Sequence, residues 1–191
     1  PLDDLDGVAA REVSSGSAAQ VQALVDERIA SRKPAAYLTK EAWLQGVSFY
    51  VDERAIVPRS FIAELIADGG IDPWLSEPSA APGRPKQASA PSGGSEAHEV
   101  ASVGGPFPRV LDLCTGNGSL AVLAAMAWPE TAVDAADLSR EALEVAAINV
   151  ARYGLDGRIR LIESDGLATL PGPYDLILCN PPYVNAQSMA A

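Results

Sequence analysis

Cysteine, histidine and positive charge are all scarce in this chain. Its 191 residues contain two cysteines and one histidine, and 14 lysines and arginines stand against 25 acidic residues, which gives a net charge of −11. The sequence holds no His/Cys cluster with the spacing of metal ligands, so we expect no metal site. A strongly acidic chain also lacks the basic face that nucleic acids require, so we expect no direct nucleic-acid binding.

Long hydrophobic runs are absent as well. No stretch of the sequence approaches the roughly 18 apolar residues of a membrane-spanning helix, and its first residues lack the charged, apolar and small segments of a signal peptide. The chain is nevertheless 48% hydrophobic, which is enough for a globular core. With so few cysteines, these features predict a reduced, cytoplasmic protein that does not enter a membrane, and we expect a monomer.

Composition divides the chain into four segments. The first, residues 1–34, holds apolar residues at helical spacing, which predict an amphipathic helix at Ser17–Arg32. One helix cannot bury its own apolar face, so we interpret this segment as the remnant of an N-terminal helical domain. The third segment, residues 77–106, is rich in Pro, Gly, Ala and Ser and is predicted to be a disordered linker. The single histidine, His98, lies in it and is not a candidate for catalysis.

The second segment, residues 35–76, changes to strand-forming residues around a Gln-Gly turn. We expect a β-hairpin at about Ala42–Tyr50, a short strand at Ala55–Val57 and a helix at Phe61–Ala67. Three aromatic residues are expected to pack in the core between the hairpin and the helix: Trp43, Phe49 and Tyr50.

The fourth segment, residues 107–191, alternates short apolar strands with helices. The expected strands are Arg109–Cys114, Thr131–Asp137, Ile159–Glu163 and Tyr174–Cys179, and the expected helices are Ser119–Ala127 and Ser139–Tyr153. Such an alternation predicts an α/β fold with a parallel sheet.

A glycine turn, Thr115-Gly116-Asn117-Gly118, joins the first of these strands to the first helix. Glycines let a ligand approach the backbone, and the first turn of a helix offers unpaired N–H groups. The spacing Gly116-x-Gly118-x-x-Ala121 also fits the dinucleotide fingerprint. By itself the loop is therefore compatible with a dinucleotide, with S-adenosylmethionine or with no ligand.

Three acidic residues stand at or after the ends of strands. Asp112 precedes the glycine turn, where a carboxylate repels an anionic pyrophosphate and attracts the cationic groups of S-adenosylmethionine; alternatively, it bonds the amides of the turn. Asp137 ends the second strand, where an acid accepts ribose hydroxyls or simply begins the next helix. By position Asp165 is a candidate for the adenine amino group, although acid–glycine turns are common after strands.

The fourth strand ends in Asn180-Pro181-Pro182-Tyr183, the most specific motif in the chain. Two prolines hold the backbone extended and remove two N–H donors. The amide oxygen of Asn180 and the carbonyl of Pro181 can then accept hydrogen bonds from a planar –NH₂ group, while Tyr183 stacks on its plane. The alternative is a plain proline turn.

Together, Asp112–Gly118 and Asn180–Tyr183 resemble the amino-methyltransferases that use S-adenosylmethionine. With Ala36–Trp43 and Phe49–Ser60, they are similar to the protein-glutamine methyltransferases of the HemK/Prm type. Within that family the sequences of these motifs are most similar to those of the members that modify large-subunit ribosomal protein three. The resemblance implies a Rossmann-like methyltransferase sheet, S-adenosyl-L-methionine as cofactor, a basic ribosomal protein as partner, and methyl transfer to the amide nitrogen of a glutamine.

The resemblance also implies roles for individual residues. It places the cofactor against Asp112, Cys114, Thr115, Gly116, Asn117, Gly118, Asp137, Asp165 and Asn180. It places the glutamine on Asn180, Pro181, Pro182 and Tyr183, with Asn180, Pro181 and Tyr183 as the catalytic group. Arg59 is a weaker candidate for the carboxylate end of the cofactor. The transfer is expected to be direct and to need no general base.

Length departs from the family, because such a domain continues well beyond Tyr183. We therefore expect a C-terminally truncated chain with a partial sheet. Three alternatives stay open: a release-factor glutamine methyltransferase, a nucleic-acid amino-methyltransferase and an inactive cofactor-binding fragment. The strand order usual in methyltransferases makes the first and fourth strands neighbours, so Cys114 and Cys179 are expected to lie close together as free thiols.

Overall fold

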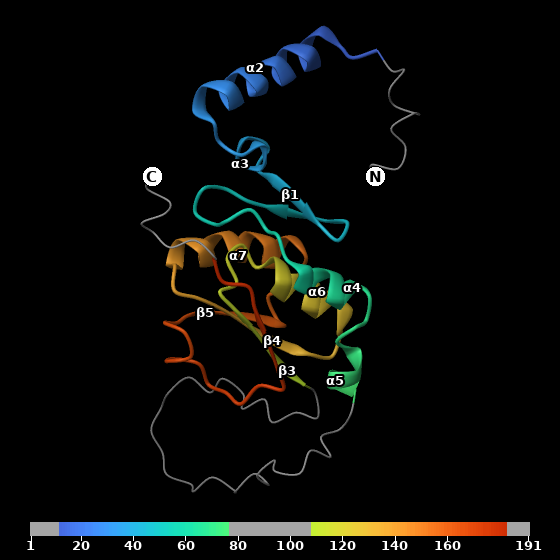
Figure 1. Ribbon diagram of the computed structural model, residues 1–191, viewed down its shortest axis with the longest axis vertical. Helices are drawn as coiled ribbons and strands as arrows, with labels where there is room; N and C mark the ends of the chain where they lie inside the picture. The colour runs from blue at the N-terminus through green and yellow to red at the C-terminus, as the bar shows by residue number, and fades with distance from the viewer. Residues whose placement is uncertain (1–11, 77–107, 183–191) are drawn as a thin grey trace, which may run out of the picture.

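The computed structural model describes residues 12–76 and 108–182. A four-stranded sheet with helices packed on it forms the body, and an antiparallel hairpin lies across one of those helices (Figure 1). The predicted linker and Tyr183 fall outside the described residues.

The sheet is parallel throughout and has the order β5-β4-β3-β6. Its strands are β3 (Arg109–Leu113), β4 (Ala132–Asp137), β5 (Ile159–Glu163) and β6 (Leu176–Cys179). Each lies where the apolar runs predict a strand, although β6 begins later than expected. The predicted α/β class and the pairing of the first strand with the fourth are confirmed.

Two helices, α6 (Ser119–Ala127) and α7 (Arg140–Arg152), cover one face of this sheet. They share a face because both crossovers, β3 to β4 and β4 to β5, step in the same direction and parallel crossovers are right-handed. α6 is apolar on all sides because it is buried between the sheet and α4. At its C-terminal end Arg158 donates to three backbone carbonyls and caps them.

The hairpin consists of β1 (Glu41–Leu44) and β2 (Val47–Tyr50). Ala42 and Phe49 pair across it and turn their side chains into the core. Trp43 points the other way and is 63% exposed, so the prediction that it packs in the core is wrong. The cause is strand alternation, which sends neighbouring side chains to opposite faces.

Two further expectations for this part of the chain need correction. No strand forms at Ala55–Val57, because the chain turns there and the N–H of Ala55 donates to the carbonyl of Asp52 at 3.1 Å. A short helix, α3 (Ala35–Thr39), precedes the hairpin. The strand-forming Tyr37 lies in that helix and donates its hydroxyl to the carbonyl of Ala55 at 3.0 Å.

Helix α4 (Phe61–Ala67) begins at Ser60, whose side chain accepts from the N–H of Ile62, and it packs on α6. A second short helix, α5 (Asp72–Ser76), was not expected from the sequence. It is tied to the end of α6 by the indole N–H of Trp128, which donates to Asp72 at 2.8 Å.

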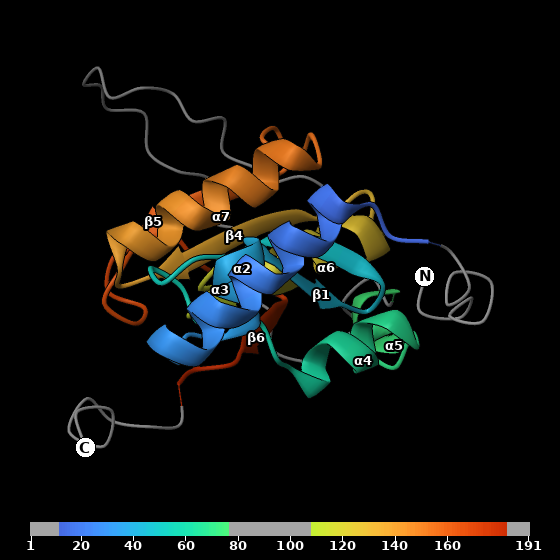
Figure 2. The same cartoon turned by 90° about the horizontal axis from the view of Figure 1, so that it is seen from above.

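Helix α2 (Ser15–Ser31) stands away from the body in Figure 1, and in the view from above in Figure 2 it passes in front of it. The predicted helix is confirmed, but none of its residues is buried, so its apolar residues pack against no core. The helical domain expected around it is not among the described residues.

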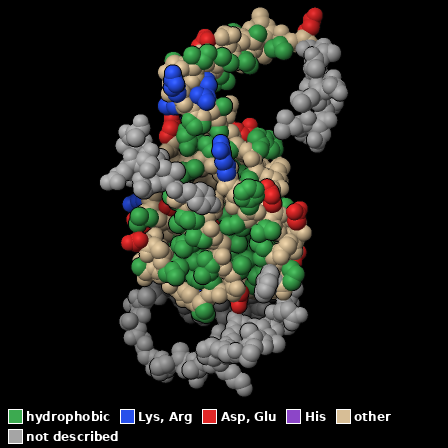
Figure 3. All heavy atoms as spheres, viewed as in Figure 1, with side chains coloured by type: hydrophobic (Ala, Val, Ile, Leu, Met, Phe, Trp, Pro, Cys, Tyr) green, Lys and Arg blue, Asp and Glu red, His purple; other side chains and the backbone are tan. Residues whose placement is uncertain are grey.

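Hydrophobic side chains also gather over the body on the face that Figure 3 turns to the viewer. On β6, Ile177 remains 49% exposed. None of the described helices is long and apolar enough to cross a membrane.

Candidate functional site at the carboxyl edge of the sheet

The carboxyl ends of parallel strands meet at one edge of a sheet, and ligands of open α/β sheets bind outside that edge. The predicted site residues stand there: the glycine loop follows β3, Asp137 ends β4, Asp165 follows β5 and Asn180 follows β6. The first strand, β3, lies between β4 and β6.

The two glycines of the loop have different surroundings. Gly116 has φ +56°, and open space lies where a side chain would point. Gly118 has φ +79°, and an added Cβ would meet the Cβ of Ala146 on α7 at 3.1 Å. Gly116 therefore exposes backbone to a ligand, whereas Gly118 lets the loop pack closely on α7.

Asp112 is fully buried beneath this loop. One carboxylate oxygen, Oδ2, accepts from the hydroxyl of Thr115 at 2.5 Å and from the N–H of Ala121 at 3.0 Å. The other, Oδ1, has no hydrogen-bond partner among the described residues. Burial raises the pKa of Asp112 to about 7, and the bonds from Thr115 and Ala121 oppose that rise. The carboxylate thus joins the loop to the first turn of α6.

Asp137 holds the open side of the loop. Its Oδ2 accepts from the N–H of Gly116 at 2.9 Å, and its Oδ1 accepts from the N–H of Ser139 at 2.9 Å. The residue is half-buried at the strand end, so its carboxylate is reachable from the edge of the sheet. One side chain therefore orients both the glycine turn and the start of α7.

The acid–glycine turn after β5 is more open. Asp165 is exposed, and Gly166 has φ +55° with free space around its Cα. Ser164 beneath them is buried, and its hydroxyl donates to the carbonyl of Gly166 at 2.9 Å. Ser164 therefore fixes the turn from below, and Asp165 and Gly166 remain accessible.

Asn180 is tied to the segment that follows the hairpin. Its Nδ2 donates to the carbonyl of Arg59 at 2.8 Å, while the side chain of Arg59 is exposed. Pro181 and Pro182 are exposed, and Tyr183 lies outside the described residues. The contact joins two motifs that the sequence separates, and nothing in the local pattern of either one predicts it.

The two cysteines meet as expected. Leu113 pairs with Cys179 in the sheet, which brings Cys114 next to that residue. Both are free cysteines. Burial first, and then the neighbouring Cys179, raise the pKa of the Cys114 thiol above its usual value. Within the described residues, no group of three or more metal-ligating side chains forms.

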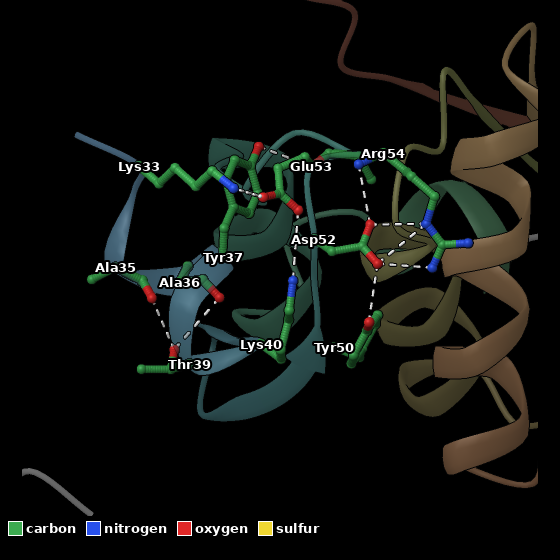
Figure 4. A network of polar contacts seen from close by, with 11 residues as sticks. Lys33, Ala35, Ala36, Tyr37, Thr39, Lys40, Tyr50, Asp52, Glu53 and Arg54 are labelled. Carbon is green, nitrogen blue, oxygen red and sulfur yellow. Dashed lines mark hydrogen bonds and ion pairs between the residues drawn. The ribbon is translucent and has the colours of Figure 1, made fainter. Parts of the chain in front are cut away.

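A polar network fixes the segment between the hairpin and Arg59 (Figure 4). Asp52 accepts from the guanidinium of Arg54 at 2.8 Å and from the hydroxyl of Tyr50 at 3.0 Å, and the bond from Arg54 holds the pKa of Asp52 well below its usual value. Arg54 also reaches Glu144 on α7 at 3.0 Å. The ion pair of Lys33 with Glu53, at 2.7 Å, ties the start of α3 to the same segment.

One buried residue was missed from the sequence. Asn149, on α7, is fully buried and bonds both the hairpin and the glycine loop. An asparagine in the middle of an apolar helix face is a sequence signal, because such a residue must find partners inside the fold. Its partners cannot be read from local pattern, because they lie far away along the chain.

Residues 101–191 match a family described as "Methyltransferase small domain". The match covers the glycine loop, Asp137, Asp165 and the Asn-Pro-Pro-Tyr motif. With the strand order and the site at the carboxyl edge, it makes the sheet part of a Rossmann-like methyltransferase fold.

The proteins that the chain is similar to also match its hairpin. The chain is 45% identical over 192 residues to the ribosomal protein uL3 glutamine methyltransferase of Bordetella pertussis, covering 100% of this chain and 55% of that protein. The protein of the same name from Burkholderia pseudomallei is 45% identical over 198 residues, covering 100% and 56%. The chain thus spans about half the length of the curated relatives it matches.

Among solved structures, TrmN from Thermus thermophilus is 36% identical, with a TM-score of 0.38, over 40% of this chain and 24% of that chain.

Proposed function

We propose that this chain is part of an enzyme that transfers a methyl group from S-adenosyl-L-methionine to the side-chain amide nitrogen of a glutamine in ribosomal protein uL3. The support is the identity of 42–45% to proteins named for that activity, which extends over both the hairpin and the sheet. The methyltransferase family match supports the cofactor class.

The glycine loop and its acidic neighbours fit this cofactor. Gly116 leaves its backbone open at the edge of the sheet, and the accessible carboxylate of Asp137 suits ribose hydroxyls. Asp165 and Gly166 offer an open rim for the adenine ring. Asp112 acts from below the loop, by holding Thr115 and the start of α6. S-adenosylmethionine supplies an electrophilic methyl group on a positively charged sulfur.

The contact between Asn180 and Arg59 carries the proposal for the acceptor. Because the amide nitrogen of Asn180 donates to the carbonyl of Arg59, the oxygen of the same planar amide points in the other direction. That oxygen and the carbonyl of Pro181 can accept the two hydrogens of a glutamine –NH₂ group. These bonds would aim the nitrogen lone pair and increase its electron density, so positioning supplies most of the acceleration.

Charge supports a ribosomal protein as substrate. The chain carries a net charge of −11, and ribosomal proteins are generally basic, so their association is favoured electrostatically. A nucleic-acid acceptor would meet repulsion from the same charge. The proteins are expected to meet in the cytoplasm.

The first experiment is calorimetric titration of the chain with S-adenosylmethionine. We expect one site with micromolar affinity. Asp137→Ala should abolish binding, because it removes the acceptor that orients Gly116 and faces the ribose. Glu163→Ala is the matched control, since Glu163 is an exposed acid on the neighbouring strand and should bind as the wild type does. A folded chain that does not bind contradicts the cofactor assignment.

Methyl transfer is then measured with labelled cofactor on purified uL3. Two proteins are compared: the chain itself, and a chimera that joins it to the parts of the Bordetella pertussis relative that lie outside the match. In the active protein, Asn180→Ala should reduce kcat by about a hundredfold or more and change cofactor affinity little, because a positioned acceptor acts on the reacting group. Equal losses in both quantities would contradict the role of Asn180. Labelling of a release factor or of RNA, and not of uL3, would point to another substrate.

A further inference from the structure

Asn149 uses its whole side-chain amide to hold two distant segments. Its Oδ1 accepts from the N–H of Tyr50 at 2.7 Å. Its Nδ2 donates to the carbonyl of Tyr50 at 2.9 Å and to the carbonyl of Asn117 at 2.8 Å. The residue is fully buried, so water cannot replace these bonds.

The pair of bonds to Tyr50 copies the pattern of a neighbouring β-strand, which exchanges one N–H and one carbonyl bond with its partner. The hairpin is therefore fastened to α7 through its backbone at the end of β2. Asn117 adds a second link, because its own Nδ2 donates to the carbonyl of Tyr50 at 3.4 Å. The hairpin and the cofactor loop thus meet at one buried point.

The same part of α7 supports the cofactor loop from below. Ala146 lies one turn before Asn149, and it is the residue against which Gly118 packs. A shift of the glycine loop therefore moves the carbonyl of Asn117 relative to Asn149, and with it the anchor of the hairpin. Close packing transmits such shifts because it leaves no room to absorb them.

The anchored strand leads directly to the acceptor side of the site. After Tyr50 the chain passes through Asp52 and Arg54, which form an ion pair (Figure 4). Arg54 also reaches Glu144 on α7. Ala55 then packs on Ala142 and Val145 of the same helix. The next residues end at Arg59, whose carbonyl holds the amide of Asn180.

We propose that Asn149 is a positioning residue that couples the cofactor loop to the hairpin segment that orients Asn180. Binding of S-adenosylmethionine at the glycine loop then stiffens the hairpin, and the acceptor site becomes ordered when the methyl donor is in place. This proposal rests on the proposed function, because it needs the glycine loop to bind that cofactor.

Hydrogen exchange with and without saturating S-adenosylmethionine tests the coupling in the wild-type chain. We expect slower exchange both in residues 114–122, which include the loop, and in residues 47–55 of the hairpin and its exit. Slower exchange in 114–122 alone would overturn the coupling and leave the proposed cofactor site intact. No change in either segment would overturn the cofactor site, and the coupling with it.

A variant separates coupling from stability. Asn149→Leu keeps a similar volume and removes all three bonds, so it should weaken cofactor binding about tenfold, within the usual range of coupling between sites. It should also abolish the change in residues 47–55. Val133→Ala is the control: this buried residue lies at the far end of β4 from Asp137 and should lower stability without either effect. If Asn149→Leu and Val133→Ala bind S-adenosylmethionine with the same affinity, the coupling is absent. If Asn149→Leu does not fold, the wild-type exchange experiment decides.

Discussion

Asp112 and Asp134 are buried on neighbouring strands of one sheet, yet their carboxylates have opposite surroundings. Asp134 lies beside two guanidinium groups, Arg109 at 3.1 Å and Arg160 at 2.8 Å, and it accepts the hydroxyl of Tyr174 at 2.7 Å. Asp112 lies on the face covered by α6 and meets only neutral donors among the described residues. One face of the sheet thus neutralises its buried charge, and the other does not.

The difference separates a structural acid from one beside the site. Asp134 stands early on β4, where two arginines from flanking strands can reach it and fasten three strands together. Asp112 stands at the end of β3, where its bonds shape the loop and burial raises its pKa to about 7. Burial of the Asp112 carboxylate is unfavourable, and a cationic cofactor bound at the loop would offset that free-energy cost. The two carboxylates should therefore respond differently to mutation and to pH.

The largest loss of stability is expected for Asp134→Ala. The change leaves Arg109 and Arg160 without their shared partner, and removing one member of a buried ion pair costs about 3–5 kcal/mol. Because Arg160 is 42% exposed and regains water, we expect about 3 kcal/mol, measured by urea unfolding at pH 7. A loss below about 1 kcal/mol would mean that the cluster behaves as a surface salt bridge.

A pH-dependent effect of the opposite sign is expected for Asp112→Asn. The pKa of Asp112 is about 7 in the folded chain, above the roughly 3.9 of an unfolded aspartate, so the folded state binds the extra proton between these values. Its contribution to stability is therefore present below about pH 4 and is lost as the pH rises to about 7, by up to about 1.4 kcal/mol per pH unit.

Urea unfolding of the wild type and of Asp112→Asn at a series of pH values from 4 to 8 measures this contribution as a difference. Asp112→Asn should gain stability relative to the wild type as the pH rises. Parallel pH profiles for the two proteins would show that Asp112 keeps an ordinary pKa, and the contrast with Asp134 would disappear.

The smallest effect is expected for Tyr174→Phe, which removes one hydrogen bond to Asp134 and leaves both arginines. The loss should be about 1 kcal/mol, the usual net value of a hydrogen bond. Spectrophotometric titration adds an independent measurement, because burial and then Asp134 raise the pKa of Tyr174 to about 12. In Asp134→Ala that pKa should fall toward 10. An unchanged pKa of Tyr174 in Asp134→Ala would show that its hydroxyl does not interact with Asp134.

Local pattern was enough for most of the sheet. Alternating apolar strands and helices predict the parallel architecture, and α6 has the expected bounds. The glycine turn and the acids at strand ends lie at one edge, as carboxyl ends of parallel strands require. Trp43 was misplaced because the register of a strand decides which face a side chain takes, and residues around it do not reveal that register.

The sequence by itself determined the strand-turn-helix unit, the residues at each strand end and the Asn-Pro-Pro-Tyr motif, because these depend on neighbours along the chain. Only the tertiary structure decided that the carbonyl of Arg59 holds Asn180, and that Asn149 joins Tyr50 to Asn117. Backbone carbonyls and N–H groups occur at nearly every position, so composition carries no signal for which of them a distant amide will meet. Packing of the hairpin on α7 makes that selection.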